Sequence, residues 1–119
     1  MSKTFHELVA DIKKNVKECT VDEVKKMKSE KHDFVLVDTR EESEFAEGRI
    51  KGAIHIGKGI IERDIHLHVP HKEKKIVLYC GGGFRSALAA HNLQLMGYSN
   101  VISMDGGWKG WVSSQGETE

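Results

Sequence analysis

A cysteine, a glycine triplet and an arginine fall within six consecutive positions of the sequence and could together carry out nucleophilic chemistry. Cys80 ends a short apolar run and is followed by Gly81-Gly82-Gly83-Phe84-Arg85-Ser86. Because glycines lack a Cβ, consecutive backbone N–H groups in this stretch can converge on one point and hold an anion. The guanidinium of Arg85 and the positive end of a following helix also favour an anionic sulfur over a neutral thiol. The pattern therefore predicts a nucleophilic Cys80 thiolate in a cradle formed by the backbone of residues 81–86.

Other interpretations of the same stretch fit its spacing less well. A buried structural cysteine beside a tight turn would need no guanidinium five positions later, whereas a charged sulfur or an anionic substrate would. A nucleotide phosphate loop requires a lysine directly after its glycines, and this stretch has none. A dinucleotide fingerprint would use the glycine triplet and Asp105. However, Ser86 replaces its third glycine, and the fourteen residues after Asp105 are too few for the rest of that fold.

Four charged residues elsewhere are weaker candidates for the same site. Asp38 and Arg40 follow a predicted strand and could face Cys80, but we prefer a buried ion pair that ties the strand to neighbouring loops. Arg49 and Lys51 could add positive potential at the mouth of a pocket, although exposed charges in a turn usually have no specific role. We therefore expect Asp38, Arg40 and Arg49 at most to support the site.

Three histidines and a second cysteine also invite a functional interpretation. For His66, His68 and His71 we prefer a solvated loop before Pro70 to a metal site, because acidic and thiolate ligands do not cluster with them in the usual pattern. Cys19 could act as a resolving thiol, but it precedes a predicted helix far from Cys80 in the sequence. We expect neither group to take part in the chemistry.

Alternating strand and helix patterns predict the elements that position Cys80. Compact apolar runs predict strands over residues 34–37, 53–56, 75–79 and 101–104, and apolar spacing predicts helices over residues 4–16, 20–28, 41–46, 59–67 and 86–96. This alternation predicts an α/β fold with a mainly parallel central sheet of about four or five strands and helices on both faces. Ligand sites in such sheets lie at the carboxyl ends of the strands, where Cys80 falls. Residues 113–119 are expected to form a frayed polar tail.

Composition narrows the class of protein. With 119 residues, 39% of them hydrophobic and 30% charged, the chain suits one globular domain over residues 1–119. Its 18 basic and 18 acidic residues leave no basic excess that would favour nucleic acid. Two cysteines cannot form a disulfide framework, and the sequence shows no apolar signal segment or membrane-length run. We therefore expect a cytoplasmic protein with neither a nucleic-acid nor a membrane partner.

The length of the loop after Cys80 separates two kinds of cysteine enzyme. Tyrosine and dual-specificity phosphatases place five residues between their cysteine and arginine, whereas four separate Cys80 from Arg85. The tighter ring suits one additional sulfur atom better than a tetrahedral phosphate. At this point the sequence resembles the rhodanese (thiosulfate sulfurtransferase) family in its single-domain form, over roughly residues 20–112.

Further segments carry the resemblance. They are Val37-Asp38-Thr39-Arg40, the stretch from Glu44 to Ile54, the active-site stretch from Cys80 to Ser86, and Gly97 to Val101 with Asp105-Gly106-Gly107-Trp108 and Trp111. Two positions depart from the family pattern, because Arg49 stands where the family usually has His and Lys51 where it usually has Pro. These departures make the turn less rigid and more basic.

The resemblance implies a two-step transfer of sulfane sulfur. Cys80 would take sulfur from a small anionic donor such as thiosulfate, forming a persulfide, and then pass it to cyanide, a thiol or a protein thiol. Gly81, Gly82, Gly83, Phe84, Arg85 and Ser86 would bind the substrate and hold the persulfide, without a metal or organic cofactor. The alternatives are a sulfur carrier or regulatory module without turnover and, less favoured, a cysteine-dependent phosphatase or arsenate reductase. The donor and the acceptor stay open.

Overall fold

A computed structural model describes residues 2–119, so Met1, which belongs to the predicted domain, lies outside the described residues. Within that range the strands are β1 (Lys17–Cys19), β2 (Val35–Asp38), β3 (Ile54–His55), β4 (Ile76–Tyr79) and β5 (Val101–Met104). The helices are α1 (Phe5–Lys13), α2 (Val21–Ser29), α3 (Glu42–Glu47), α4 (Ile61–His68), α5 (Phe84–Leu95) and α6 (Gly107–Ser113). The strands form one parallel sheet in the order β1-β5-β4-β2-β3. The α/β fold expected from the sequence is confirmed.

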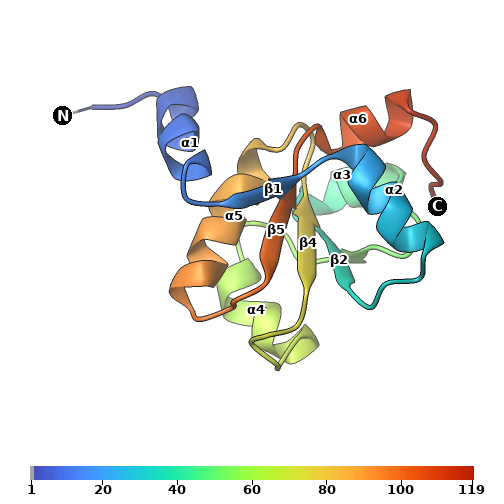
Figure 1. The fold of residues 1–119 in the computed structure, drawn as a ribbon. Coiled ribbons are helices and arrows are strands. Elements are labelled where there is room, and N and C mark those ends of the chain that lie inside the picture. Colours follow the sequence, from blue (N-terminus) through green and yellow to red (C-terminus); the bar gives the residue numbers. More distant parts are fainter. Residues whose placement is uncertain (1) are drawn as a thin grey trace.

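Helices cover both faces of this sheet, as Figure 1 shows. Along β4, Ile76 and Leu78 pack into a core with side chains from α1, α4 and α5, whereas Val77 and Tyr79 pack into a second core with side chains from α2 and α6. This alternation follows from the two-residue period of a strand. Because both faces are buried, β4 consists entirely of large apolar side chains.

Capping boxes fix where the first two helices begin. The Thr20 hydroxyl accepts a hydrogen bond from the Glu23 N–H while the Glu23 carboxylate accepts one from the Thr20 N–H. Thr4 and Glu7 form the same arrangement before α1. Two helix boundaries differ slightly from expectation. Helix α1 ends at Lys13 rather than at residue 16, and α5 begins at Phe84 rather than at residue 86. The early start of α5 brings its first turn up to the glycine triplet.

Strand β1 was not expected from the sequence. It pairs with β5, so that Cys19 lies opposite Met104 in the register. Its first two residues, Lys17 and Glu18, are exposed, and a polar strand of three residues has no apolar run to mark it. The pairing nevertheless places the start of α2 directly after the edge of the sheet.

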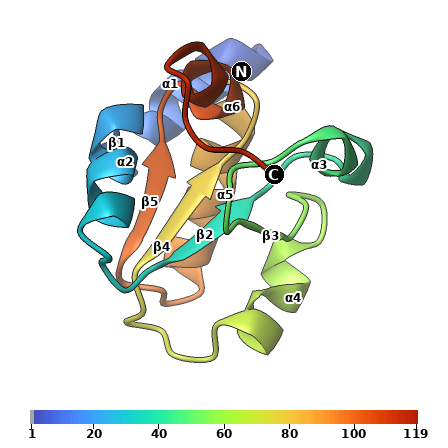
Figure 2. The same cartoon turned by 90° about the vertical axis from the view of Figure 1, so that its right-hand side faces the viewer.

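The C-terminal residues are bound rather than frayed, which corrects the expectation for residues 113–119. Arg49 and Glu119 each donate a backbone N–H to the other's carbonyl, at 3.1 and 2.9 Å, and Ile50 forms an antiparallel bridge with Thr118. The indole N–H of Trp111 donates to the Glu117 carbonyl at 2.9 Å. Figure 2 shows this tail running beside the segment that leads into β3. Backbone pairing of this kind leaves little trace in a polar sequence.

The histidine-rich segment also differs from expectation. His66 and His68 lie in the last turn of α4, at the end of the helix predicted over residues 59–67 and not in the solvated loop preferred for them, and His71 follows Pro70. Across residues 2–119 no three His, Cys, Asp or Glu side chains gather as a metal site would require. Over the same range, no helix combines the length and the apolar content needed to cross a bilayer.

Candidate active site

Cys80 lies at the carboxyl end of the central strand β4, directly before the loop that starts α5. The Gly83 N–H donates to the Cys80 Sγ at 3.1 Å, and the Ser86 hydroxyl lies 3.6 Å from the same sulfur. Gly83 caps α5 with a φ of 98°, a left-handed conformation that an L side chain rarely adopts. The loop and the first turn of α5 thus direct donors toward the sulfur.

These donors decide the ionisation of the buried thiol. Burial alone raises the pKa of Cys80, but hydrogen bonds from the Ser86 side chain and from the backbone N–H groups of Ser86, Gly83 and Gly82 lower it by more. The net effect is a Cys80 pKa below the ordinary value for a cysteine. A lowered pKa increases the share of thiolate, the nucleophilic form, at neutral pH.

A second serine supports this arrangement from the neighbouring strand. The hydroxyl of Ser103, in β5, lies 2.9 Å from the Ser86 hydroxyl, and both side chains are fully buried. Ser103 occupies the one polar position of an otherwise apolar strand. A hydroxyl in the middle of a buried run was the available signal for this residue, and the sequence reasoning did not use it.

Arg85 forms an ion pair that sequence reasoning did not anticipate. Its Nη1 and Nη2 donate to the two carboxylate oxygens of Glu44, on α3, at 2.9 and 3.3 Å. The Glu44 hydrogen bond is also the largest of the effects that raise the pKa of Arg85, and the charge of Cys80 adds to them. Arg85 therefore faces both the candidate nucleophile and a carboxylate.

These groups line a pocket of about 410 Å³. Its lining consists of Phe5, Glu44, Cys80, Gly81, Gly82, Phe84, Arg85 and Lys109. Phe5 comes from α1 and packs edge-on against Phe84, with 6.2 Å between the ring centroids. The pocket can thus present the Cys80 sulfur, cationic groups and two aromatic rings to a small molecule.

Comparison with known proteins places the chain in a family. The model of the rhodanese-like domain matches residues 20–114. The chain belongs to the rhodanese-like family. It is 30% identical over 81 residues to the thiosulfate sulfurtransferase GlpE of Coxiella burnetii, a match that covers 68% of this chain and 74% of that protein.

Other proteins that are similar to this chain carry different names. The chain is 36% identical over 85 residues to the tRNA uridine(34) hydroxylase of Bdellovibrio bacteriovorus, but that match covers 69% of this chain and only 24% of the hydroxylase. Among solved structures, a Rhodopseudomonas palustris protein of unknown function, described as a possible tyrosine phosphatase, has a TM-score of 0.86 at 28% identity. That alignment covers 100% of this chain and 96% of the other. Similarity to this chain is therefore shared by proteins with several names.

In this rhodanese-like chain, Asp38 and Arg40 form the buried ion pair expected from the sequence. The Arg40 guanidinium donates to both carboxylate oxygens of Asp38, at distances of 2.8 to 3.1 Å. It also donates to the Gly48 carbonyl at 2.6 Å and stacks 4.7 Å from the Trp108 ring centroid. The pair joins β2 to the segment after α3 and to α6, and neither residue lines the Cys80 pocket.

Arg49 and Cys19 also lie apart from that pocket. The Arg49 guanidinium packs 4.2 Å from the Phe45 ring centroid, and its Nε donates to the Phe45 carbonyl. Cys19 belongs to the edge strand β1, with β5 between it and β4. Burial raises the pKa of Cys19 to about 11, so its thiol stays protonated at neutral pH. Neither residue lines the pocket.

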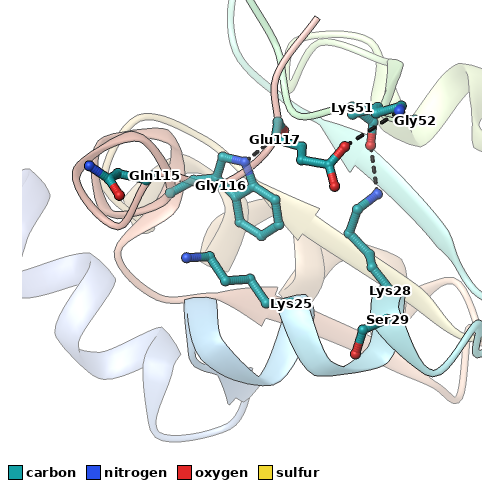
Figure 3. Close-up of a pocket in the computed structure, with 9 residues that line it drawn as sticks. Lys25, Lys28, Ser29, Lys51, Gly52, Gln115, Gly116 and Glu117 are labelled. Carbon is teal, nitrogen blue, oxygen red and sulfur yellow. Dashed lines mark hydrogen bonds and ion pairs between the residues drawn. The ribbon is translucent and has the colours of Figure 1, made fainter.

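A larger hollow of about 600 Å³ lies elsewhere, between α2 and the C-terminal tail (Figure 3). Three lysines line it, but their ammonium groups already have partners. Lys25 donates to the Ser114 carbonyl and Lys28 to the Lys51 carbonyl, each at 2.6 Å, while Lys51 lies 3.4 Å from the Glu117 carboxylate. None of its described lining residues is a cysteine. The chemistry of a rhodanese-like protein is better sought at Cys80.

The residues that sequence reasoning missed at the pocket are Phe5, Glu44 and Lys109. Glu44 follows Asp38 and Arg40 at the carboxyl end of β2, but only the strand order of the structure, in which β2 neighbours β4, brings it to the pocket. No sequence signal placed Phe5 at the pocket, since apolar spacing in α1 indicates a buried face without saying what that face covers.

Proposed function

We propose that this protein transfers sulfane sulfur through a persulfide on Cys80. In the first step the Cys80 thiolate attacks the outer sulfur of a donor such as thiosulfate. A new S–S bond forms, the old S–S bond breaks, and sulfite leaves with the bonding electron pair. In the second step an acceptor nucleophile, cyanide in an assay or a thiol, attacks the terminal sulfur and releases the Cys80 thiolate.

The observation that carries this proposal is the hydrogen bonding of the Cys80 sulfur inside a pocket. The Gly83 N–H and the Ser86 hydroxyl both lie beside Sγ, and together with the backbone N–H groups of Ser86 and Gly82 they outweigh the effect of burial on its pKa. The same donors would stabilise the negative charge of a persulfide as it forms. The names of sulfurtransferase relatives support the same reaction class.

Each proposed step is a displacement at sulfur, so the scheme requires only a donor and an acceptor. Residues 81–86 would surround the terminal sulfur, and Arg85 would interact with the anionic end of the donor. Asp38 and Arg40 would act on the site only by holding β2 and its neighbouring segments in place. We assign no step to Arg49.

Intact-mass measurement tests the proposal directly. After incubation with thiosulfate and removal of excess donor, the protein should gain one sulfur atom, which a reducing thiol should then remove. Cys80→Ser should abolish the gain, while Cys19→Ser, which changes the other cysteine of the chain, should retain it. A gain that survives Cys80→Ser would overturn the assignment of the nucleophile.

Two further measurements separate the alternatives. Repeated release of sulfite with cyanide as acceptor distinguishes an enzyme from a carrier, which would load sulfur once without turnover. Hydrolysis of para-nitrophenyl phosphate tests the phosphatase alternative, which the description of the Rhodopseudomonas palustris structure raises. We expect no hydrolysis that depends on Cys80, because the loop to Arg85 contains four residues rather than five.

A further inference from the structure

The hollow of about 600 Å³ between α2 and the C-terminal tail lies apart from Cys80 and carries an excess of positive charge. Its volume falls within the range of about 300–1,000 Å³ that is typical of small-molecule sites. Its described lining contains one acidic side chain, Glu117, and three basic ones, Lys25, Lys28 and Lys51. Glu117 already pairs with Lys51 at 3.4 Å. The charges of the other two lysines therefore remain without a counter-charge in the lining.

The partners of Lys25 and Lys28 satisfy hydrogen bonds without neutralising charge. Lys25 donates to the Ser114 carbonyl and Lys28 to the Lys51 carbonyl, each at 2.6 Å, and no carboxylate of residues 2–119 pairs with either ammonium. An ammonium has three N–H donors, so each lysine keeps its charge and two further donors. Both residues are half-buried, and a charge partly removed from water is costly without a counter-ion. An anion in the hollow would supply that counter-ion.

The two ammonium groups start from one face of α2 and reach different segments. Lys25 and Lys28 are three positions apart, so their Cβ atoms lie about 5–6 Å from each other on the same side of the helix. One ammonium is held against Ser114, directly after α6, and the other against Lys51, in the turn before β3. Figure 3 shows the two side chains diverging as they leave α2. Separated cations of this kind suit a ligand with two linked anionic groups better than one small anion.

We propose that this hollow binds a small molecule that carries a diphosphate group. One phosphate would face Lys25 and the other Lys28, and their oxygens would accept the N–H donors that the carbonyl partners leave free. Two linked phosphates bring at least two negative charges at neutral pH, which matches the two lysines without a counter-charge. The site is separate from Cys80, so the inference goes beyond the proposed sulfur transfer and does not depend on it.

Isothermal titration calorimetry with inorganic pyrophosphate, at an ionic strength held constant with sodium chloride, tests the site. We expect saturable binding, and Lys25→Gln or Lys28→Gln should each raise the Kd at least about fivefold, because a charge-assisted hydrogen bond is lost. Lys26→Gln is the matched control, since Lys26 lies on the same helix, is exposed and does not line the hollow. Absence of saturable binding, or equal weakening in Lys26→Gln, would overturn the proposal.

The Cys80 pocket also has cationic side chains, Arg85 and Lys109, so it needs a control of its own. Lys109→Gln removes one positive charge there and should leave the Kd for pyrophosphate within about twofold of the parent value, because solvent and salt screen distant charges. Cys80→Ser should bind pyrophosphate like the parent protein, so failure of this site and failure of sulfur transfer can be told apart. A Kd that responds to Lys109→Gln and not to Lys28→Gln would overturn the inference.

Glu117→Gln tests the sign of the charge effect. Removing this carboxylate frees the Lys51 ammonium and takes a negative charge from the hollow, so pyrophosphate should bind about threefold tighter. The substitution keeps the Glu117 carbonyl that accepts the Trp111 indole N–H. Glu73→Gln is the control, because Glu73 is exposed in the segment before β4 and does not line the hollow. Equal gains in both variants, or weaker binding in Glu117→Gln, would contradict an anion site beside Glu117.

Two further probes test the diphosphate assignment. Orthophosphate reaches only one of the two lysines, so its Kd should be at least about tenfold higher than that of pyrophosphate. Citrate offers carboxylates in place of phosphates and should also bind more weakly than pyrophosphate. Equal affinity for orthophosphate would contradict a site for two linked groups, and equal or tighter binding of citrate would contradict a preference for phosphate.

Discussion

At Cys80, burial and hydrogen bonding act on one sulfur in opposite directions. The side chain is almost completely buried, which by itself favours the neutral thiol. The Ser86 hydroxyl and the amides of the loop outweigh that effect and lower the pKa of Cys80, because they donate hydrogen bonds to the anion. Cys19 shows what burial does without such donors, since its pKa rises to about 11. Local donors, rather than exposure, therefore distinguish the two cysteines.

This contrast predicts selective alkylation. At about pH 7 iodoacetamide should modify Cys80 much faster than Cys19, because the lowered pKa of Cys80 gives it more thiolate while the raised pKa of Cys19 leaves it protonated. As the pH falls, the Cys80 rate should decline at a lower pH than the rate of an ordinary cysteine thiol. Peptide mapping by mass spectrometry measures both rates. Equal modification of the two cysteines would contradict the role assigned to the loop donors.

Ser86→Ala tests the largest of these donors. Loss of its hydroxyl removes a charge-assisted hydrogen bond, so alkylation of Cys80 at about pH 6.5 should slow roughly tenfold. Ser103→Ala should slow it less, since Ser103 acts only through Ser86. Ser113→Ala, on the exposed end of α6, should leave the rate unchanged. If all three variants react like the parent protein, the hydroxyls do not control the thiol.

At the level of elements, the first turn of α6 holds the cysteine loop in place through hydrogen bonds to its backbone carbonyls. The Trp108 N–H donates to the Cys80 carbonyl at 2.8 Å, and the Lys109 N–H donates to the Gly81 carbonyl at 3.1 Å. This approach requires Gly107, because a Cβ there would lie 2.4 Å from the Cys80 carbonyl oxygen. The first turn of α6 and the loop therefore form one hydrogen-bonded unit.

Gly107→Ala should consequently destabilise the protein strongly. Its φ of 54° would cost an alanine about 1–2 kcal/mol, and the contact with the Cys80 carbonyl adds a steric cost. Gly97→Ala is the control for the backbone cost, because Gly97 also has a positive φ but has open space around its Cβ position. The difference between the two variants therefore measures the steric cost at Gly107. Urea unfolding should show a clearly larger loss for Gly107→Ala. Equal losses would mean that the close approach of α6 is easily relieved.

The sequence predicted the elements that carry strong local patterns. Residues 101–104 form β5 as expected, and the glycine triplet marked the loop, because apolar runs and glycines act through local geometry. Sequence reasoning missed β1, whose three residues are mostly polar. It also missed the pair of Glu44 with Arg85, because that contact depends on β2 lying beside β4. Strand order is a tertiary property that spacing alone does not contain.

On the scale of the whole molecule, the segments before and after residues 20–114, which the family model matches, both contact that matched region. Helix α1 precedes the matched residues 20–114, yet its Phe5 lines the Cys80 pocket. The tail after residue 114 pairs with the segment around Ile50, a fully buried residue. These contacts lead us to propose that residues 1–119 fold as one cooperative unit.

Deletion of residues 117–119 tests that cooperativity. The deletion removes the backbone pairing with Arg49, the carbonyl that accepts the Trp111 indole N–H, and the antiparallel bridge of Thr118 with Ile50. A lost hydrogen bond contributes about 1 kcal/mol and an unpaired buried donor costs somewhat more, so the free energy of unfolding should fall by about 1–3 kcal/mol. Urea unfolding should still show one transition of nearly unchanged slope, because the tail buries little of the total surface.

Glu119→Gln is the control for that deletion. It keeps the backbone pairing with Arg49 and an oxygen that can accept the Gly52 N–H, so the loss should stay below about 0.5 kcal/mol. Stability unchanged by the deletion would mean that the tail only rests on the fold. Two separate transitions in the full-length chain would instead show that it does not fold as one unit. The contacts of the tail with Trp111 and Ile50 predict a single transition in every variant. This transition should shift to a lower urea concentration with the deletion and stay nearly in place with Glu119→Gln.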